Sequence, residues 1–212
     1  MYYKKISGFL NQVFVTQTHG YIDISQKQDF WKLMGDDLNV NLKISHNSGN
    51  ELKSLCICIP YKNQVIKITE SDTKPLKFEV DFVYKLDSEL TVGSVGKVGR
   101  FLYHFSGKTI ETGITKFDDQ YLIESKDKSM TICLLSNIVI DTMFKHNVYS
   151  LSISTNSKKK TSKLISVFGR NIFEMQTMKE LVHLHFIIIE KLQELKIIKM
   201  DMLNIVHKPE TQ

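Results

Sequence analysis

Arginine is almost absent from this chain: only Arg100 and Arg170 stand beside 26 lysines in a sequence of 212 residues. Arginine makes the bidentate contacts by which proteins recognise guanine and grip phosphate groups. Its scarcity argues against sequence-specific nucleic-acid recognition, although an AT-rich genome would also lower the arginine content. We therefore do not expect nucleic acid to be the main partner.

Cysteine is also rare. The chain has three cysteines, and such a small, odd number does not indicate a disulfide framework. This usage indicates a reducing compartment, so we expect a cytoplasmic protein. In the run LCICI, a strand would point Cys56 and Cys58 to one face, where an extended backbone cannot close a bridge between them. A metal site there would need two further ligands. Cys133 and His46 are conceivable, but no spacing supports them, and we interpret the cysteines as small apolar side chains.

Long hydrophobic runs are missing as well. No stretch approaches the roughly 20 residues of a membrane-spanning helix, so we expect no membrane span. The N-terminus places Lys4 and Lys5 before apolar residues, as a signal peptide would. However, Asn11 and Gln12 interrupt the apolar stretch and no small-residue cleavage site follows, so we do not expect export.

The common catalytic motifs do not occur with the spacing that they require. GSVGKVG at Gly93–Gly99 has neither the Walker nor the dinucleotide spacing, and we interpret it as a turned or flexible connection. His183 and His185 stand two residues apart on a predicted helix and would point about 200° from each other, so they cannot share a metal. Asp118 and Asp119 suit capping or turn roles. We therefore predict no catalytic residue, cofactor or metal.

The composition is that of a folded globular protein, with 42% hydrophobic and 24% charged residues. The length allows one large domain. We predict a single α+β unit over residues 1–212. This organisation allows two similar sub-halves, 1–90 and 117–205, joined by a glycine-punctuated connection.

Alternation of apolar and polar residues predicts an antiparallel sheet with one side against a core. The clearest strand is Leu76–Tyr84, where apolar residues alternate with Lys77, Glu79 and Asp81. Further strands are expected over Leu38–Ser45, Leu52–Pro60, Gln64–Thr69, Gln120–Glu124, Val148–Thr155 and Lys163–Phe168.

Three helices are expected to pack against this sheet. The first would begin at Ser25 as N-cap and end at Gly35. An internal helix is predicted over Ser129–Lys145. A long C-terminal helix is predicted over Glu174–Leu203, because its leucines and isoleucines recur at helical spacing. The fold class is therefore α+β, with an antiparallel sheet packed against an internal helix and a long C-terminal helix.

The segment Ile110–Leu135 reads IETGITKFDDQYLIESKDKSMTICLL. It resembles a family of uncharacterised bacterial proteins that carry the pattern F-D-x-x-[FY]-x-[IV]-x-[ST] and then a helix near a Leu-Leu pair. The likeness covers about half of the chain, and Ile114 replaces the acidic residue that usually follows the glycine. Because that family has no assigned activity, the resemblance implies no catalytic residue. It implies a core anchor at Phe117 and a loop or strand-start cap at Asp118. The matching positions are Phe117, Asp118, Tyr121, Ile123, Ser125, Leu134 and Leu135.

The positive charge lies in the C-terminal third. Residues 1–144 hold 17 basic and 17 acidic residues, whereas residues 145–212 hold 11 basic and 6 acidic residues. Lys158, Lys159 and Lys160 form a predicted hairpin tip, and with Lys163 and Arg170 they are candidate contacts for an anionic partner. The same lysines would also protect strand edges from pairing, and both interpretations stay open.

These patterns favour a non-enzymatic intracellular binding protein that uses the C-terminal helix and the basic hairpin. Two alternatives stay open. One is an enzyme or small-ligand protein with a pocket between sheet and helices. A pocket lined by converging polar groups such as His104, Asp118 or Asp119 would favour it. The other is weak, sequence-independent nucleic-acid binding by the basic C-terminal third, which would lose affinity steeply with salt.

The apolar end of the C-terminal helix predicts a homodimer or a protein partner, because exposed apolar groups need cover. The predicted interface residues are Ile198, Met202, Leu203, Ile205 and Val206. We expect truncation after Lys199 to convert a dimer into a monomer by light scattering and to lower the unfolding temperature. A full-length monomer whose unfolding is unchanged by the truncation would contradict this prediction.

Overall fold

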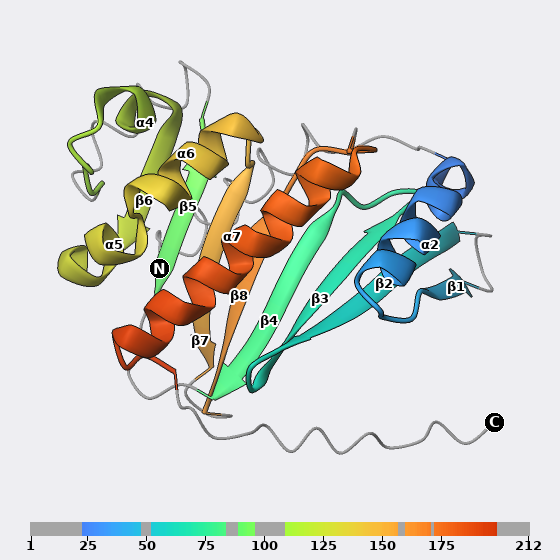
Figure 1. Cartoon of the computed structure of the whole chain (residues 1–212). Helices are drawn as coiled ribbons and strands as arrows, with labels where there is room; N and C mark the ends of the chain where they lie inside the picture. The colour runs from blue at the N-terminus through green and yellow to red at the C-terminus, as the bar shows by residue number, and fades with distance from the viewer. Residues whose placement is uncertain are drawn as a thin grey trace.

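Eight strands pair into one sheet in the computed structural model, in the order β1-β2-β3-β4-β8-β7-β5-β6, and all seven pairs are antiparallel (Figure 1). The structure describes residues 23–47, 52–83, 89–95, 109–156, 160–170 and 172–198. The strands are β1 (Lys43–Asn47), β2 (Leu52–Tyr61), β3 (Gln64–Ser71), β4 (Lys77–Val83), β5 (Leu90–Ser94), β6 (Tyr121–Ser125), β7 (Ser150–Asn156) and β8 (Thr161–Val167). The helices are η1 (Ile24–Lys27), α2 (Gln28–Asp37), α4 (Thr115–Gln120), α5 (Lys128–Leu134), α6 (Asn137–Lys145) and α7 (Met175–Glu194).

The strands form two groups that share the sheet. β1 to β4 follow one another as a meander, whereas in the second group β7 lies between β8 and β5. The groups join where β4 pairs with β8, with Val80 opposite Leu164. The strands of both predicted sub-halves, 1–90 and 117–205, therefore lie in one continuous sheet.

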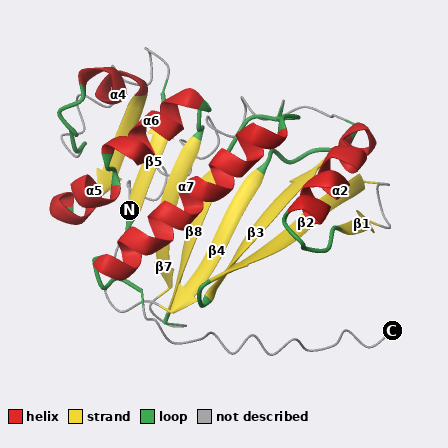
Figure 2. Cartoon of the chain, viewed as in Figure 1, coloured by secondary structure: helices red, strands yellow, loops and turns green. Residues whose placement is uncertain are grey.

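The longer helices lie on one face of this sheet, with α7 running across it and α2 and α6 on either side (Figure 2). On β4 the alternate residues Phe78, Val80 and Phe82 are buried. The predicted α+β class, with an antiparallel sheet packed against internal and C-terminal helices, is confirmed. None of the described helices is long and apolar enough to cross a bilayer. The opposing layer of the core is the predicted stripe of α7, which buries Leu181, Leu184, Ile188 and Leu192.

The first helix begins and ends at residues other than those predicted. Asp23 rather than Ser25 is the cap, since its carboxylate accepts the N–H of Ser25 at 2.9 Å and the turn η1 precedes α2. The helix then continues through Gly35 to Asp37. A Cβ at Gly35 would lie 2.8 Å from the carbonyl oxygen of Val40, so this glycine allows close backbone contact and does not stop the helix.

The turn that leaves α2 shortens the first predicted strand. Asn39 has a left-handed φ of 53°, and the amide of Val40 bonds back to the carbonyl oxygen of Gly35 at 2.8 Å. The strand predicted over Leu38–Ser45 therefore begins only at Lys43, because the residues before it belong to the turn.

The second group of strands contains three features that the sequence pattern did not predict. β5 lies within the region interpreted as a connection, and its Gly93 pairs with neighbouring strands on both sides. The short helix α4 precedes β6. The helix predicted over Ser129–Lys145 is divided into α5 and α6 at Leu135, because Ser136 adopts an extended conformation and begins α6 as its N-cap residue.

The C-terminal helix ends at Glu194, well before its predicted end. The amide of Ile197 donates to the carbonyl oxygen of Leu192 at 2.9 Å. The amide of Lys196 donates to the carbonyl oxygen of Gln193, also at 2.9 Å, and the two bonds together form a Schellman motif. Lys196 has a left-handed φ of 56° at the position that glycine usually occupies, so the sequence carried no stop signal here.

A buried histidine fastens α7 to the sheet. Nδ1 of His185 lies 2.7 Å from the carbonyl oxygen of Leu181, so Nδ1 donates and Nε2 accepts from the hydroxyl of Ser166 at 2.9 Å. The ring stacks on Phe78 with centroids 4.4 Å apart. Burial lowers the pKa of His185 to about 4, so the imidazole is neutral at pH 7.

We expect folding stability to fall as the pH falls from about 7 to about 4. In the unfolded chain His185 takes up a proton near its ordinary pKa of 6.5, whereas the folded chain resists protonation down to about 4. The contribution of the neutral His185 to folding stability is therefore fully present above pH 6.5. Acidification to below about pH 4 removes up to about 3 kcal/mol of stability. Urea unfolding at several pH values measures the loss.

Two histidine variants isolate this effect. His185→Gln should lose stability at pH 7 and lose this part of the pH dependence. His183→Gln, on the exposed side of the same helix, should keep it. An unchanged pH dependence in His185→Gln would contradict the assignment.

Candidate functional site

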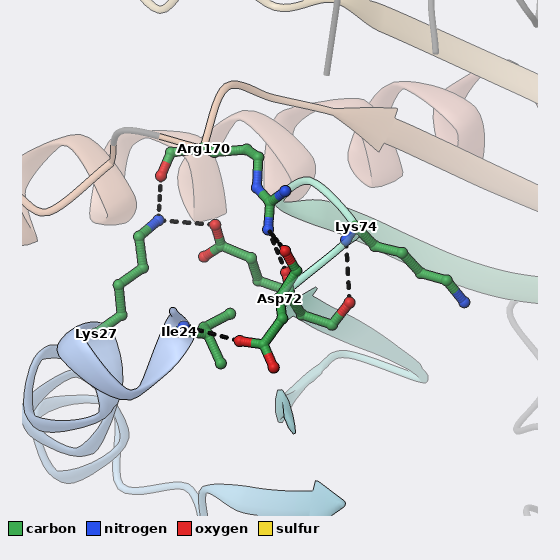
Figure 3. Close-up of polar contacts among 7 residues, drawn as sticks. Ile24, Lys27, Asp72, Lys74 and Arg170 are labelled. Atoms are coloured by element: carbon green, nitrogen blue, oxygen red, sulfur yellow. Dashed lines mark hydrogen bonds and ion pairs between the residues drawn. The ribbon is translucent and has the colours of Figure 1, made fainter. Parts of the chain in front are cut away.

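A cluster of buried charges joins three distant segments of the chain (Figure 3). Nζ of Lys27 lies 2.7 Å from Oε1 of Glu70 and also donates to the carbonyl oxygen of Arg170. The guanidinium of Arg170 donates to the carbonyl oxygens of Ser71 and Asp72. Burial raises the pKa of Glu70, and the ammonium group of Lys27 opposes that change.

Asp72 completes the connection between these segments. Its Oδ1 accepts the amide of Ile24 at 2.8 Å, and its Oδ2 accepts the amide of Lys53 at 2.7 Å. The start of η1, the first residues of β2 and the loop after β3 are thereby held together. Because the charges of this cluster satisfy one another and the backbone, we interpret it as part of the fold and not as a binding site.

An open groove lies between α6 and α7, with a volume of about 420 Å³. On each helix its lining residues follow the helical spacing of an outward face, while the opposite faces bury residues such as Val139, Met143 and Leu181. We name this hollow the α6–α7 groove. It is lined by the polar residues Asp141, Thr142, Lys145, Gln176, Lys179, Glu180 and His183.

Glu180 holds the two walls of the α6–α7 groove together. Its carboxylate lies 2.7 Å from Nζ of Lys145 and 2.7 Å from Nε2 of His146, both at the end of α6. It also accepts from Gln176 at 3.1 Å. Lys145, then Gln176 and His146, lower the pKa of Glu180 to about 2. This carboxylate is therefore ionised at neutral pH, far from the pKa near 7 that suits a general acid or base.

The rim of the α6–α7 groove adds two features. Lys179 forms an ion pair with Asp37 at 2.9 Å, which connects the groove to α2. Ile138 is 60% exposed and lies one helical turn before Asp141 and Thr142 on α6. The surface therefore combines both signs of charge with an exposed apolar side chain.

Most of the groove was not predicted from the sequence. His183 was considered only as a metal ligand and rejected; it is exposed while His185 is buried, as their spacing predicts. A usable signal was present in the polar residues that recur three and four apart on each helix. The sequence does not indicate, however, that α6 and α7 lie next to each other.

The predicted anion contacts have different surroundings. Lys160 is exposed in the turn before β8 with a φ of 51°. Lys163 lies on β8 and forms ion pairs with Glu79 at 3.3 Å and Asp81 at 3.4 Å. Arg170 is only 8% exposed and belongs to the buried cluster, so it does not extend a surface patch of lysines. Outside the described residues lie Lys158 and Lys159.

The predicted interface at the C-terminal end begins inside the core. Ile198 is 3% exposed, as is its neighbour Ile197, and both follow the Schellman turn of α7. The first part of this apolar stretch is therefore covered by the chain itself. Outside the described residues lie Met202, Leu203, Ile205 and Val206.

Asp118 stabilises the loop before α4 through hydrogen bonds. Its carboxylate accepts the amide and the hydroxyl of Thr112 at 2.9 and 2.8 Å, and the amide of Gly113 at 3.0 Å. Gly113 has a φ of 85°, which explains a glycine at this turn. Asp119 is exposed, and His104 lies outside the described residues.

We expect Lys27→Met to destabilise the protein by about 3–5 kcal/mol, because it leaves the carboxylate of Glu70 buried without its cation. The double variant Lys27→Met/Glu70→Leu should recover most of that loss. Denaturant unfolding of both single variants and the double variant gives the coupling energy.

The matched control is Lys62→Met. It removes an exposed ion pair with Glu190 at 2.9 Å and should cost far less stability than Lys27→Met, because water and salt screen exposed charges. Equal losses for Lys27→Met and Lys62→Met would show that the buried pair has no special weight in the fold.

No protein-family model matches this chain, and no curated protein matches it significantly. Among solved structures, the chain is similar to the crystal structure of the mycobacterial trehalose monomycolate transport factor A, TtfA. The likeness has a TM-score of 0.52, covers 81% of this chain and 97% of that chain, and has 5% sequence identity. At this identity the comparison shows a similar fold: the sheet-and-helix arrangement of this chain also occurs in a transport factor.

Proposed function

We propose that this protein is a non-enzymatic binding protein that contacts a protein partner through the α6–α7 groove. The observation that carries the proposal is the meeting of two outward-facing polar rows in one open hollow of about 420 Å³. The C-terminal helix, which the sequence predicted as a contact surface, supplies four of the seven lining residues. They are Gln176, Lys179, Glu180 and His183.

The chemistry of the groove favours a protein segment over a lipid chain or a small apolar ligand. A site for apolar molecules is lined mainly by apolar side chains, whereas all seven residues that line this groove carry polar groups at the ends of carbon chains or rings, and these groups include both signs of charge. Protein interfaces combine an apolar anchor with a polar surround, and the exposed Ile138 beside Asp141 offers that combination. The strongly held Glu180 supports a positioning role and not proton transfer.

TtfA, whose fold is similar, is described as a transport factor, and we propose a non-enzymatic role in a transport process for this chain. The three cysteines of this chain, which are too few for a disulfide framework, favour a reducing location, which we propose to be the cytoplasm. The homodimer predicted from the apolar C-terminal residues would be a second contact, separate from the groove.

Site-specific photo-crosslinking in the native host tests this proposal. A photoreactive amino acid at Thr142 in the full-length chain should form a crosslink to one defined protein, identified by mass spectrometry. The same amino acid at the exposed Lys32 of α2 should not form that crosslink. Equal crosslinking to the same protein from both positions would contradict binding at the groove.

Binding of the purified partner then gives the energetics. We expect Asp141→Arg/His183→Glu to weaken binding at least about tenfold, because it reverses the charge at one wall and adds a negative charge at the other. Asp36→Arg, an exposed charge reversal on α2, should bind as the unmodified chain does. Unchanged affinity in the groove variant, measured by calorimetry with intact folding, would rule out this surface.

A further inference from the structure

Two thiols lie side by side on the sheet face opposite the helices. Cys56 and Cys58 alternate along β2 with Leu55, Ile57 and Ile59, which are buried in the helix-covered core. Both cysteines are thiols and half-buried, so a small solute can reach them.

The neighbouring strands place two lysines beside this pair. Cys56 lies opposite Lys43 on β1 and Thr69 on β3, and Cys58 lies opposite Lys67 on β3. β1 begins at Lys43, so no described residue of β1 is paired with Cys58. Two lysines on the neighbouring strands therefore lie next to the pair.

The two thiols interact but are poorly placed for a disulfide. The side chain of Cys56 is hydrogen-bonded to that of Cys58, and this bond and burial raise the pKa of Cys56 while Lys67 and Lys43 oppose the rise. Positions two apart on a strand are separated by about 6.7 Å, whereas a disulfide needs Cβ atoms about 4 Å apart. A larger bridging atom fits this spacing better than a direct sulfur–sulfur bond.

We propose that Cys56 and Cys58 form a two-coordinate binding site for a soft monovalent cation, Cu(I). Soft thiolate ligands favour Cu(I), zinc and iron–sulfur clusters over the harder biological cations. With metal–sulfur bonds of about 2.3 Å, as in zinc thiolate sites, a linear bridge lets the sulfurs lie up to about 4.6 Å apart. Side chains that point to the same face of β2 can reach that separation by rotation about their Cα–Cβ bonds.

The surroundings argue against a closed zinc site. Structural zinc takes four protein ligands, and no group of three or more His, Cys, Asp or Glu side chains gathers among the described residues. His46 pairs with Lys53 and therefore faces the other side of the sheet, and Cys133 lies on α5. Two sulfurs suffice for Cu(I), whereas they leave Zn²⁺ without half of its ligands.

The binding step balances without a redox partner. Each thiol releases one proton to solvent and donates one sulfur lone pair to Cu(I), which keeps its oxidation state. The neutral dithiol thereby becomes a bis-thiolate complex with a charge of minus one. Lys43 and Lys67 are the neighbouring cations that offset this charge.

Anaerobic titration of the reduced full-length chain with Cu(I) tests the proposal, with bicinchoninate as a competing chelator whose absorbance reports transfer. We expect one tightly bound Cu(I) per chain. Cys56→Ser and Cys58→Ser should each weaken binding at least tenfold. Cys133→Ser, which removes the third thiol of the sequence, should leave it unchanged.

A second measurement is independent of the variants. X-ray absorption of the Cu(I)-loaded chain should show two sulfur neighbours and no third ligand. A third ligand, or equal binding by Cys56→Ser and the unmodified chain, would overturn the proposal. Loss of binding in Cys133→Ser would also overturn it. Circular dichroism of each serine variant confirms that a loss of binding does not come from unfolding.

Discussion

The β4–β8 strand pair is the contact on which the rest of the structure depends. It joins the β1–β4 meander to the later strands, and its register places Phe78 opposite Ser166. His185 of α7 stacks on the first of these residues and accepts a hydrogen bond from the second. Because both nitrogens of a buried imidazole need partners, this junction sets the rotation of α7 as well as its position.

The rotation of α7 determines what the molecule presents on its helical side. With Leu181 and Leu184 turned toward the sheet, Lys179, Glu180 and His183 face outward. Glu180 then meets Lys145 and His146 at the end of α6, and this ion-paired contact joins the two walls of the α6–α7 groove. The opposite face of the sheet has a different chemistry, because there the strands expose the alternate residues of β2, including both thiols.

Much of the fold could be predicted from local pattern. The alternation in Leu76–Tyr84 identified β4 and its buried face, and Phe117, which was expected to be a core anchor, is fully buried. The errors fall where a residue does not have the backbone role that is usual for its type. Lys196 ends α7 in a left-handed conformation without glycine, and Gly35 lies inside a helix because another chain segment approaches it.

The sequence by itself determined which side of β4 and of α7 is apolar, because that information lies in residues a few positions apart. It also determined that His183 and His185 point apart and that the two thiols share a face. Only the tertiary structure decided that α6 lies beside α7, that Arg170 is buried, and that Glu180 meets Lys145, 35 residues away. Such contacts arise when separate apolar faces are buried together against one sheet, and no local spacing specifies which faces will become neighbours.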